Sequence, residues 1–317
     1  MENLKKKQHY VWKHYLSAWT TNNSLACLLK KENKIITVNT DKVASKKFFY
    51  ELSYLTKKEE QIFNYMFIDN YSDQSKKLNE HWLHTSQAVF ELEKFFQNLP
   101  DSTWKQESLK EIEIRKKNLV ENLFASIEGN AVENLKQLRD GDISFFEKEK
   151  DKVDFCIFVA CQYFRTKRMQ DLVVGALNDK NKQHEQLADV NWDAIIKMGR
   201  LVMMTNIGLV LYSNYRCVML ENNTSTPFIT GDQPTVNMDA EMYHMTNGVS
   251  PKTLTIYYPV SPTKAILLTE DKTIATHIKV SENDVERYNN KIAITSNEQL
   301  YATSVNCLKR FEQDKSK

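Results

Sequence analysis

The prolines of this chain are distributed so unevenly that they divide it into a helical part and a β-rich part. The 317 residues contain only six prolines, and none lies between Asp101 and Thr226. Proline breaks helix interiors because it lacks an N–H donor and its ring clashes with the preceding turn. A proline-free run of this length predicts a series of helices. Five of the six prolines lie between Pro227 and Pro262, where strand signals dominate.

Helix-start signals and apolar periodicity predict the helices of the central part, residues 56–220. Thr56 and Glu59 have the spacing of a capping box, in which hydroxyl and carboxylate satisfy amides at the start of a helix. Further helices are expected over 76–97, 103–127, 152–177 and 193–212. The last two are largely apolar on every face, which is typical of helices buried at the centre of a domain.

Both ends of the chain carry β signals. A short helix from Trp12 precedes two expected strands over 25–30 and 34–38, and strands are also expected over 215–220, 228–230, 253–260 and 264–269. Two helices finish the chain, one capped at Ser281 and one over 298–311. We therefore predict an α+β fold in a single domain, 1–317. A helical bundle (56–220) is inserted into a mixed or antiparallel sheet built from an N-terminal helix and hairpin (1–55) and a β-rich segment (221–317).

Composition excludes several classes of protein. The net charge is only +2, so any nucleic-acid contact must come from a local patch. Five scattered cysteines without a C-x-x-C pair argue against a disulfide framework and a structural zinc site. The N-terminus has no apolar segment of a signal peptide, and the longest apolar run, 201–212, is too short to span a bilayer. We expect a cytoplasmic protein that does not enter the membrane.

The tract Pro227–Met238, PFITGDQPTVNM, concentrates residues of low structural tolerance. Gly231 allows backbone angles that other residues avoid, and Pro234 pushes Gln233 towards an extended conformation. Asp232 and Gln233 would therefore be held rigidly at the end of a strand, as a binding site requires. The simpler alternative is that Asp232 caps its own turn through an Asx hydrogen bond.

Three polar residues, Gln162, Arg165 and Arg168, recur at helical spacing within the expected buried helix 152–177. A buried guanidinium needs a carboxylate or an anionic ligand, because desolvating a lone charge costs several kcal/mol. A structural interpretation pairs Arg165 with Asp232, or with an acid of its own helix such as Asp154 or Asp171. A functional interpretation has the three side chains bind phosphate or carboxylate, which match the guanidinium fork.

His9 is the candidate for acid–base chemistry, because histidine titrates near neutrality. Gln8 and Tyr10 flank it and could orient it or share its protons, although a lone histidine near a terminus is more often a packing residue. His81 and His84 lie three apart but lack a third metal ligand in view. No P-loop, dinucleotide, zincin or nucleophile-elbow motif occurs in the sequence.

Four tracts together resemble a bacterial family called Domain of Unknown Function 4238: QHYVWKHYLSAW at 8–19, FVACQYFRTKR at 158–168, PFITGDQPTVN at 227–237 and YYPVSPTKAILL at 257–268. The resemblance spans nearly the whole chain. Trp12 stands where the family usually has proline, and Gly231 where it usually has serine. The resemblance implies that the matching polar residues, His9, Gln162, Arg165 and Asp232, share a site, but it implies no reaction.

These observations lead to two hypotheses. The first is an enzyme for a phosphate-bearing substrate, nucleic acid or nucleotide, such as a nuclease of a toxin or phage-defence type. In it His9 is the general acid or base, Asp232 orients His9 or holds a divalent metal, and Arg165 with Gln162 binds phosphate. No cofactor is evident, and a metal site would need a second carboxylate, for which Asp239 and Glu241 are nearest. The second is a non-catalytic module that binds a protein partner or a second copy, with the polar cluster as a core network.

Overall fold

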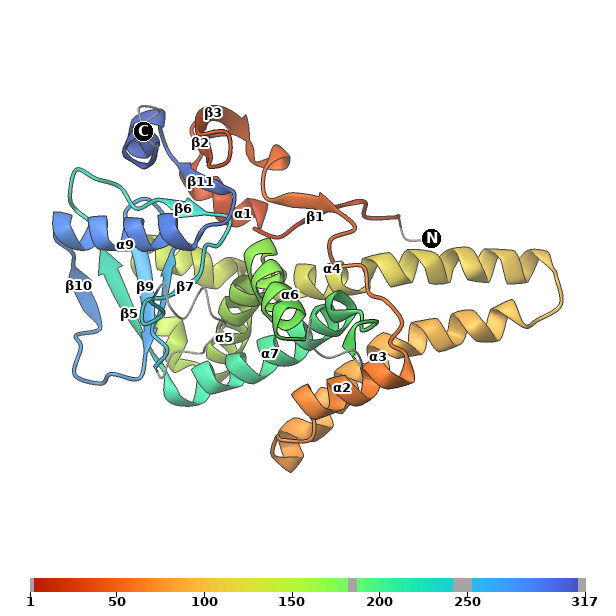
Figure 1. Cartoon of the computed structure of the whole chain (residues 1–317). Coiled ribbons are helices and arrows are strands. Elements are labelled where there is room, and N and C mark those ends of the chain that lie inside the picture. The colour runs from red at the N-terminus through yellow and green to blue at the C-terminus, as the bar shows by residue number, and fades with distance from the viewer. Residues whose placement is uncertain (1–2, 182–186, 242–252, 313–317) are drawn as a thin grey trace.

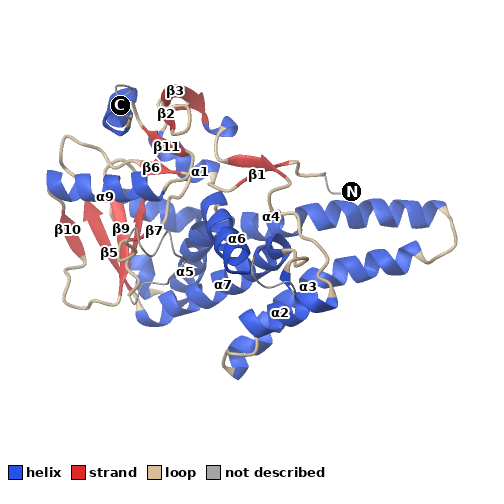
Figure 2. Ribbon diagram, in the orientation of Figure 1, coloured by secondary structure: helices blue, strands red, loops and turns tan. Residues whose placement is uncertain are grey.

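The computed structural model describes residues 3–181, 187–241 and 253–312 and has an α+β fold. Figures 1 and 2 show a central group of helices with strands gathered at one end and a long helical hairpin projecting from the other. The helices of the central part are α2 (Lys57–Phe67), α3 (Asp73–Gln97), α4 (Thr103–Asp140), α5 (Glu149–Phe164), α6 (Lys167–Asn181) and α7 (Trp192–Asn214). The projecting hairpin consists of α3 and α4.

The described strands form three sheets, of five, four and two strands. The first sheet is antiparallel except for one parallel pair, β10–β5. Its strand order is β10 (His277–Lys279), β5 (Arg216–Glu221), β9 (Lys264–Thr269), β8 (Ile256–Pro259), β7 (Val236–Asn237). The second is antiparallel, in the order β3 (Lys34–Asn39), β2 (Ser24–Leu29), β11 (Gln299–Ala302), β6 (Thr230–Gly231). A two-stranded pair joins β1 (Lys7–His9) to β4 (Ser45–Lys47). The second sheet therefore combines strands from both ends of the chain.

The remaining helices tie the sheets together. The short α1 (Lys13–Leu16) follows β1, α9 (Glu282–Thr295) packs against both sheets, and α10 (Val305–Leu308) lies near the C-terminus. On α9, Tyr288 stacks on Tyr257 of β8 with ring centroids 4.4 Å apart. One apolar core lies around these elements, and a larger one joins the N-terminal segment to α5, α7 and the inner face of the first sheet.

Local signals predicted their elements correctly. Both capping boxes are present: Thr56 with Glu59 begins α2, and Ser281 with Asp284 begins α9. The two predicted hairpins are also observed, β2–β3 near the N-terminus and β8–β9 around Ser261-Pro262-Thr263. In each case the residues that determine the element are neighbours in the sequence.

Two helix predictions were wrong. The helix expected over 152–177 is two helices, because the Thr166 hydroxyl accepts a hydrogen bond from the amide of Met169 (3.3 Å) and starts α6 anew. The helix expected over 298–311 begins instead as strand β11, whose residues pair with β2 on one side and β6 on the other. Long-range pairing thus overrides the local helical signal.

Helix α7 is long and apolar enough, by length and composition, to cross a membrane, but most of its apolar stretch is buried within the fold. Such burial is normal for a core helix, so this feature is weak evidence for a membrane. The helix predicted over 193–212 is observed, and it continues through Thr205, Asn206 and Gly208. Gly208 is required there by close packing: a Cβ would come within 2.5 Å of the Ile157 side chain on α5.

Candidate functional site

The tract Pro227–Met238 is rigid, as predicted, but for a different reason. Gly231 lies in β6, and its backbone does not adopt the left-handed conformation. A Cβ at this position would lie 2.0 Å from the Oγ of Ser296 and 2.9 Å from the carbonyl oxygen of Gln299. Glycine is therefore needed to let β6 approach the loop that precedes β11.

Asp232 is buried and holds that same loop. Its carboxylate accepts hydrogen bonds from the backbone amides of Asn297 (2.7 Å), Glu298 (2.7 Å) and Gln299 (3.1 Å). It therefore does not cap its own turn, since these amides lie 65 to 67 residues along the chain. Burial raises the pKa of Asp232 to about 6, against the opposing effect of the three amides and of Lys30.

Gln233 links the same tract to the corner between α5 and α6. Its side-chain oxygen accepts a hydrogen bond from the Thr166 hydroxyl, and its Nε2 donates to the carbonyl oxygens of Tyr163 (3.2 Å) and Thr235 (2.8 Å). Together Asp232 and Gln233 join the second sheet to the helices. Both polar side chains are saturated by protein partners, which is what a structural joint requires.

Arg165 does not pair with Asp232, nor with Asp154 or Asp171. Its Nη2 lies 2.6 Å from Oε1 of Glu128 on α4, an ion pair by distance whose N–H direction falls outside hydrogen-bond geometry. Burial is the largest single effect and lowers the pKa of Arg165, but Glu128, Tyr50 and Cys161 together outweigh it and raise that pKa. The alternative acids Asp154 and Asp171 instead pair with Lys150 and Lys167 of their own helices.

Gln162 and Arg165 carry buried polar atoms without partners. Both are almost fully buried, Gln162 in the last turn of α5 and Arg165 at its C-cap. Among the residues described, neither the Nε2 nor the Oε1 of Gln162 has a hydrogen-bond partner, and the Nε of Arg165 also lacks one. More than nine in ten buried polar groups in proteins are paired, so two such residues one helical turn apart are a candidate site for a polar ligand, as is the buried Nε2 of His9, which also has no partner in the described part of the chain. Arg168 lies beyond the break, on α6, and is not on the same helical face.

Two glutamates that flank Arg165 were not among the residues predicted from the sequence. Glu121 and Glu128 lie two turns apart on one face of α4, with Phe124 between them under the guanidinium, 5.7 Å from ring centroid to Cζ. Burial raises the pKa of Glu128, and it raises that of Glu121 to about 7, while Arg165 opposes both shifts. The seven-residue spacing was visible in the sequence, but α4 is so rich in charge that it indicated a solvated face.

His9 lies in a different environment from the one predicted. Its neighbours are Asp41, Lys13 and Lys7, and burial together with Lys13 lowers its pKa to about 4. A neutral imidazole with this pKa is a poor proton donor near neutrality. In the described part of the chain, no hydrogen bond or ion pair joins His9 to Asp232, whose two oxygens accept backbone amides instead.

Gln8 and Tyr10, the neighbours of His9, have packing roles. The Nε2 of Gln8 donates to the carbonyl oxygen of Lys117 (2.8 Å), and its Oε1 accepts from the amide of Tyr50 (2.7 Å), so Gln8 fastens β1 to α4. Tyr10 is buried against Phe49, and burial raises its pKa, as does the charge of Asp232. Neither side chain orients the imidazole.

The sequence selected no metal ligand and pointed to Asp239 and Glu241 only as the carboxylates nearest to Asp232 along the chain. Asp239 accepts a hydrogen bond from the Thr255 hydroxyl (3.0 Å), and it and Glu241 act on the pKa of Lys291 rather than on Asp232. Over the described ranges, no three His, Cys, Asp or Glu side chains are placed to hold a metal ion. His81, exposed on α3, contacts Thr85 (3.4 Å).

The fold and this site define an α+β protein in which a buried guanidinium and a buried unpaired amide lie beside two partly buried carboxylates. The chain belongs to the family described as Protein of unknown function (DUF4238), whose sequence model matches residues 7–306. The resemblance drawn from the sequence is thereby confirmed. No curated protein and no solved structure matches the chain.

Proposed function

We propose that this protein hydrolyses phosphate esters at a site formed by Gln162 and Arg165. The observation that carries the proposal is the unpaired amide of Gln162 next to the unpaired Nε of Arg165, both buried. Guanidinium and amide N–H groups are strong donors to phosphate oxygens, and they bind more strongly where water is excluded. Arg165 would neutralise the charge and Gln162 would fix the orientation of the phosphate.

The substrates to test first are RNA, DNA and nucleotides, and a nuclease of the toxin or phage-defence type in the cytoplasm is the most specific form of this proposal. His9 has no part in it as an acid, because its pKa is lowered to about 4. Asp232 has none as a ligand, because both its oxygens accept backbone amides. Dependence on a divalent metal ion is a variable of the assay.

The proposal is tested by incubating the protein with labelled single-stranded RNA, single-stranded DNA, duplex DNA and ATP, with and without Mg²⁺ or Mn²⁺. Gln162→Leu removes the amide at nearly constant volume and should lower turnover roughly tenfold or more, ~1.4 kcal/mol of transition-state stabilisation. Glu133→Gln is the matched control, since Glu133 also lies on α4 but is exposed and pairs with Lys136 (3.6 Å). No turnover of any substrate, or equal turnover by Gln162→Leu, would refute the proposal.

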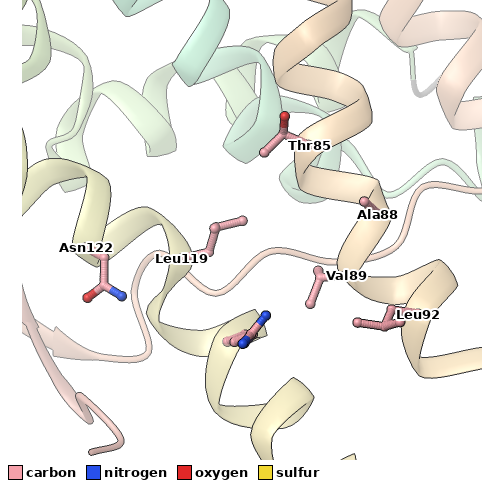
Figure 3. Close-up of a pocket in the computed structure, with 7 residues that line it drawn as sticks. Thr85, Ala88, Val89, Leu92, Leu119 and Asn122 are labelled. Atoms are coloured by element: carbon pink, nitrogen blue, oxygen red, sulfur yellow. The ribbon is translucent and has the colours of Figure 1, made fainter. Parts of the chain in front are cut away.

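The projecting hairpin favours a second candidate, a module that binds a protein partner. Between α3 and α4 lies a groove of about 260 Å³, lined mainly by apolar side chains including Val89, Leu92 and Leu119 (Figure 3). Phe95 and Trp104 near the tip of the hairpin are 58% and 60% exposed. A groove of this kind suits the apolar face of an amphipathic helix.

The partner hypothesis is distinguished from catalysis by Leu92→Glu, which places a charge in the groove, whose lining does not include Gln162 or Arg165. The hypothesis expects this variant to abolish self-association or partner binding, measured by light scattering and pull-down, and to leave any turnover intact. If wild type is monomeric and retains no partner, or if Leu92→Glu behaves like wild type in both measurements, the groove is not an interface.

A further inference from the structure

The N-terminal segment concentrates positive charge that the rest of the chain balances. Residues 5–47 contain ten lysines and only two acidic residues, so they carry a formal charge of +8, whereas the whole chain carries +2. Such an asymmetry is typical of proteins that bind a polyanion where the lysines lie together on the surface. Five of them lie on or next to the strand pair of β1 and β4, which we call the basic ribbon: Lys5, Lys6, Lys7, Lys46 and Lys47.

The lysines of the basic ribbon are exposed, and the fold does not neutralise them. Within the described ranges, none of the five forms an ion pair with a carboxylate. Lys7 donates to the backbone carbonyl oxygen of Asp41, whose carboxylate is paired with Lys13. The ladder places Lys7 opposite Lys47, and like charges in this position destabilise a strand pair. The ribbon therefore retains a charge repulsion that a bound polyanion would relieve.

The basic ribbon lies against α4. Gln8 of β1 donates to the carbonyl oxygen of Lys117 (2.8 Å), which fixes β1 alongside this helix (Figure 1). The ring centroid of Phe48, directly after β4, lies 5.2 Å from Nζ of Lys47 and 4.9 Å from Nζ of Lys117. Lys117 is itself paired with Glu113 on α4, so the unneutralised charge lies on the ribbon.

A short series of contacts joins the basic ribbon to the proposed phosphate site. The amide of Tyr50 donates to Oε1 of Gln8 (2.7 Å), and the ring of Tyr50 meets that of Phe124 edge to face, with centroids 4.7 Å apart. Phe124 in turn lies 5.7 Å from the guanidinium carbon of Arg165. A polymer bound along the ribbon would therefore pass close to the elements that hold Gln162 and Arg165.

Resting on the function proposed above for the fate of the bound strand, we infer that the basic ribbon binds the sugar–phosphate backbone of single-stranded nucleic acid. Lysine ammonium groups bind phosphates as point charges and release condensed counterions, which does not depend on base sequence. A single strand is favoured because Gln162 and Arg165 are almost fully buried, and a flexible strand can bring a phosphate closer to them than a stiff duplex can.

The surface of the basic ribbon suits a nucleic acid better than a membrane. Peripheral membrane proteins combine basic residues with large apolar side chains that enter the lipid. Among the described residues, every large apolar side chain that is exposed lies outside 5–47. Binding through the ribbon should therefore be electrostatic and strongly dependent on salt.

Binding is measured by the fluorescence anisotropy of a short labelled oligouridylate over a series of NaCl concentrations, in the cold and with EDTA. The test variant combines Lys6→Gln, Lys46→Gln and Lys47→Gln. Each phosphate contact on a single strand contributes about 0.7 to the slope of log affinity against log salt. The variant should therefore have a slope shallower by about 2 and bind roughly tenfold or more weakly at low salt.

The control variant makes the same change in net charge on exposed lysines of α3, of β10 and of the loop before β10, namely Lys77→Gln, Lys279→Gln and Lys272→Gln. It should bind as wild type does, and circular dichroism checks that both variants fold. A duplex of the same length and vesicles containing phosphatidylserine are the competing ligands.

The outcomes separate this inference from the proposed function. If the ribbon variant keeps the affinity and salt slope of wild type, or if wild type binds no oligouridylate, the inference is overturned, while hydrolysis of any substrate keeps the proposed function. If wild type binds the strand through the ribbon but hydrolyses nothing, the binding inference stands and the proposed function is wrong. Equal or tighter binding of the duplex, or binding of vesicles in salt that releases the oligouridylate, would also overturn the inference.

Discussion

Replacing Asp232 by alanine tests whether the most rigid tract of the chain is a joint or a site. The substitution leaves three partly buried amides, those of residues 297–299, without their acceptor. An unsatisfied buried donor costs about 1–3 kcal/mol, so three cost about 3–9 kcal/mol before water reaches some of them. The change also removes a buried carboxylate whose pKa of about 6 lies above the ordinary 3.8. That shift corresponds to about 3 kcal/mol of unfavourable ionisation at neutral pH.

The cost of three unpaired amides minus the relief of the unfavourable ionisation is a net destabilisation of about 3 kcal/mol. For a chain of this size it corresponds to a drop in Tm of about 6 °C. Thermal and urea unfolding followed by circular dichroism measure it. Asp189→Ala is the control, because the carboxylate of Asp189 is 77% exposed and its ion pair is with Lys58; its Tm should shift by less than about 1 °C. A Tm for Asp232→Ala equal to or above that of wild type would refute the structural role. Asp232 would then be a residue kept at a cost in stability, as functional residues often are.

Three further changes test the same physical arguments. Gly231→Ala should lower the free energy of unfolding by about 2 kcal/mol or more, because its Cβ clashes with the loop before β11. Gly129→Ala is the matched change inside α4, where there is open space, and should raise the free energy of unfolding by about 0.5–1 kcal/mol. Urea unfolding measures both. Burial raises the pKa of Glu121 in the folded protein, so the ionised carboxylate destabilises the fold and the protonated form does not. Glu121→Gln should therefore stabilise the fold at pH 8 by about 1–2 kcal/mol, after allowance for solvent access, and have almost no effect near pH 4.5. Arg165→Met should destabilise by about 3–5 kcal/mol by stranding Glu128, and adding Glu128→Leu should recover part of that loss in unfolding experiments.

The sequence predicted those parts of the fold that are encoded by neighbouring residues. Capping boxes at Thr56 and Ser281 and the turns of two hairpins are complete within a few positions, so their signals do not depend on the rest of the chain. The segment 298–311 shows the opposite case. Its residues are strand only because β2 and β6 lie on either side, and neither neighbour is close in sequence.

The same distinction explains the outcome for the site. Gln162 and Arg165 were found because a buried amide and guanidinium are unusual on an apolar helix. The ion-pair partner of Arg165 was not found, because Glu128 belongs to another helix, among many surface carboxylates. The role of Asp232 could not be predicted either, because it binds backbone amides. Every residue except proline has such an amide, so the sequence does not show which of them a carboxylate will bind.

The polar residues predicted to share one site divide into two groups, according to whether their polar atoms have hydrogen-bond partners within the chain. Gln8, Asp232 and Gln233 have their polar atoms engaged by the chain itself, and through those bonds they fix β1 to α4 and the second sheet to the α5–α6 corner. Gln162 and Arg165, anchored next to that corner, keep donors without partners. Hydrogen bonds from a ligand contribute most where folding leaves a buried group unpaired, because replacing a bond that is already satisfied brings little net free energy. The rigid tract therefore supports the position of the site, and the chemistry is expected where α5 ends against α4.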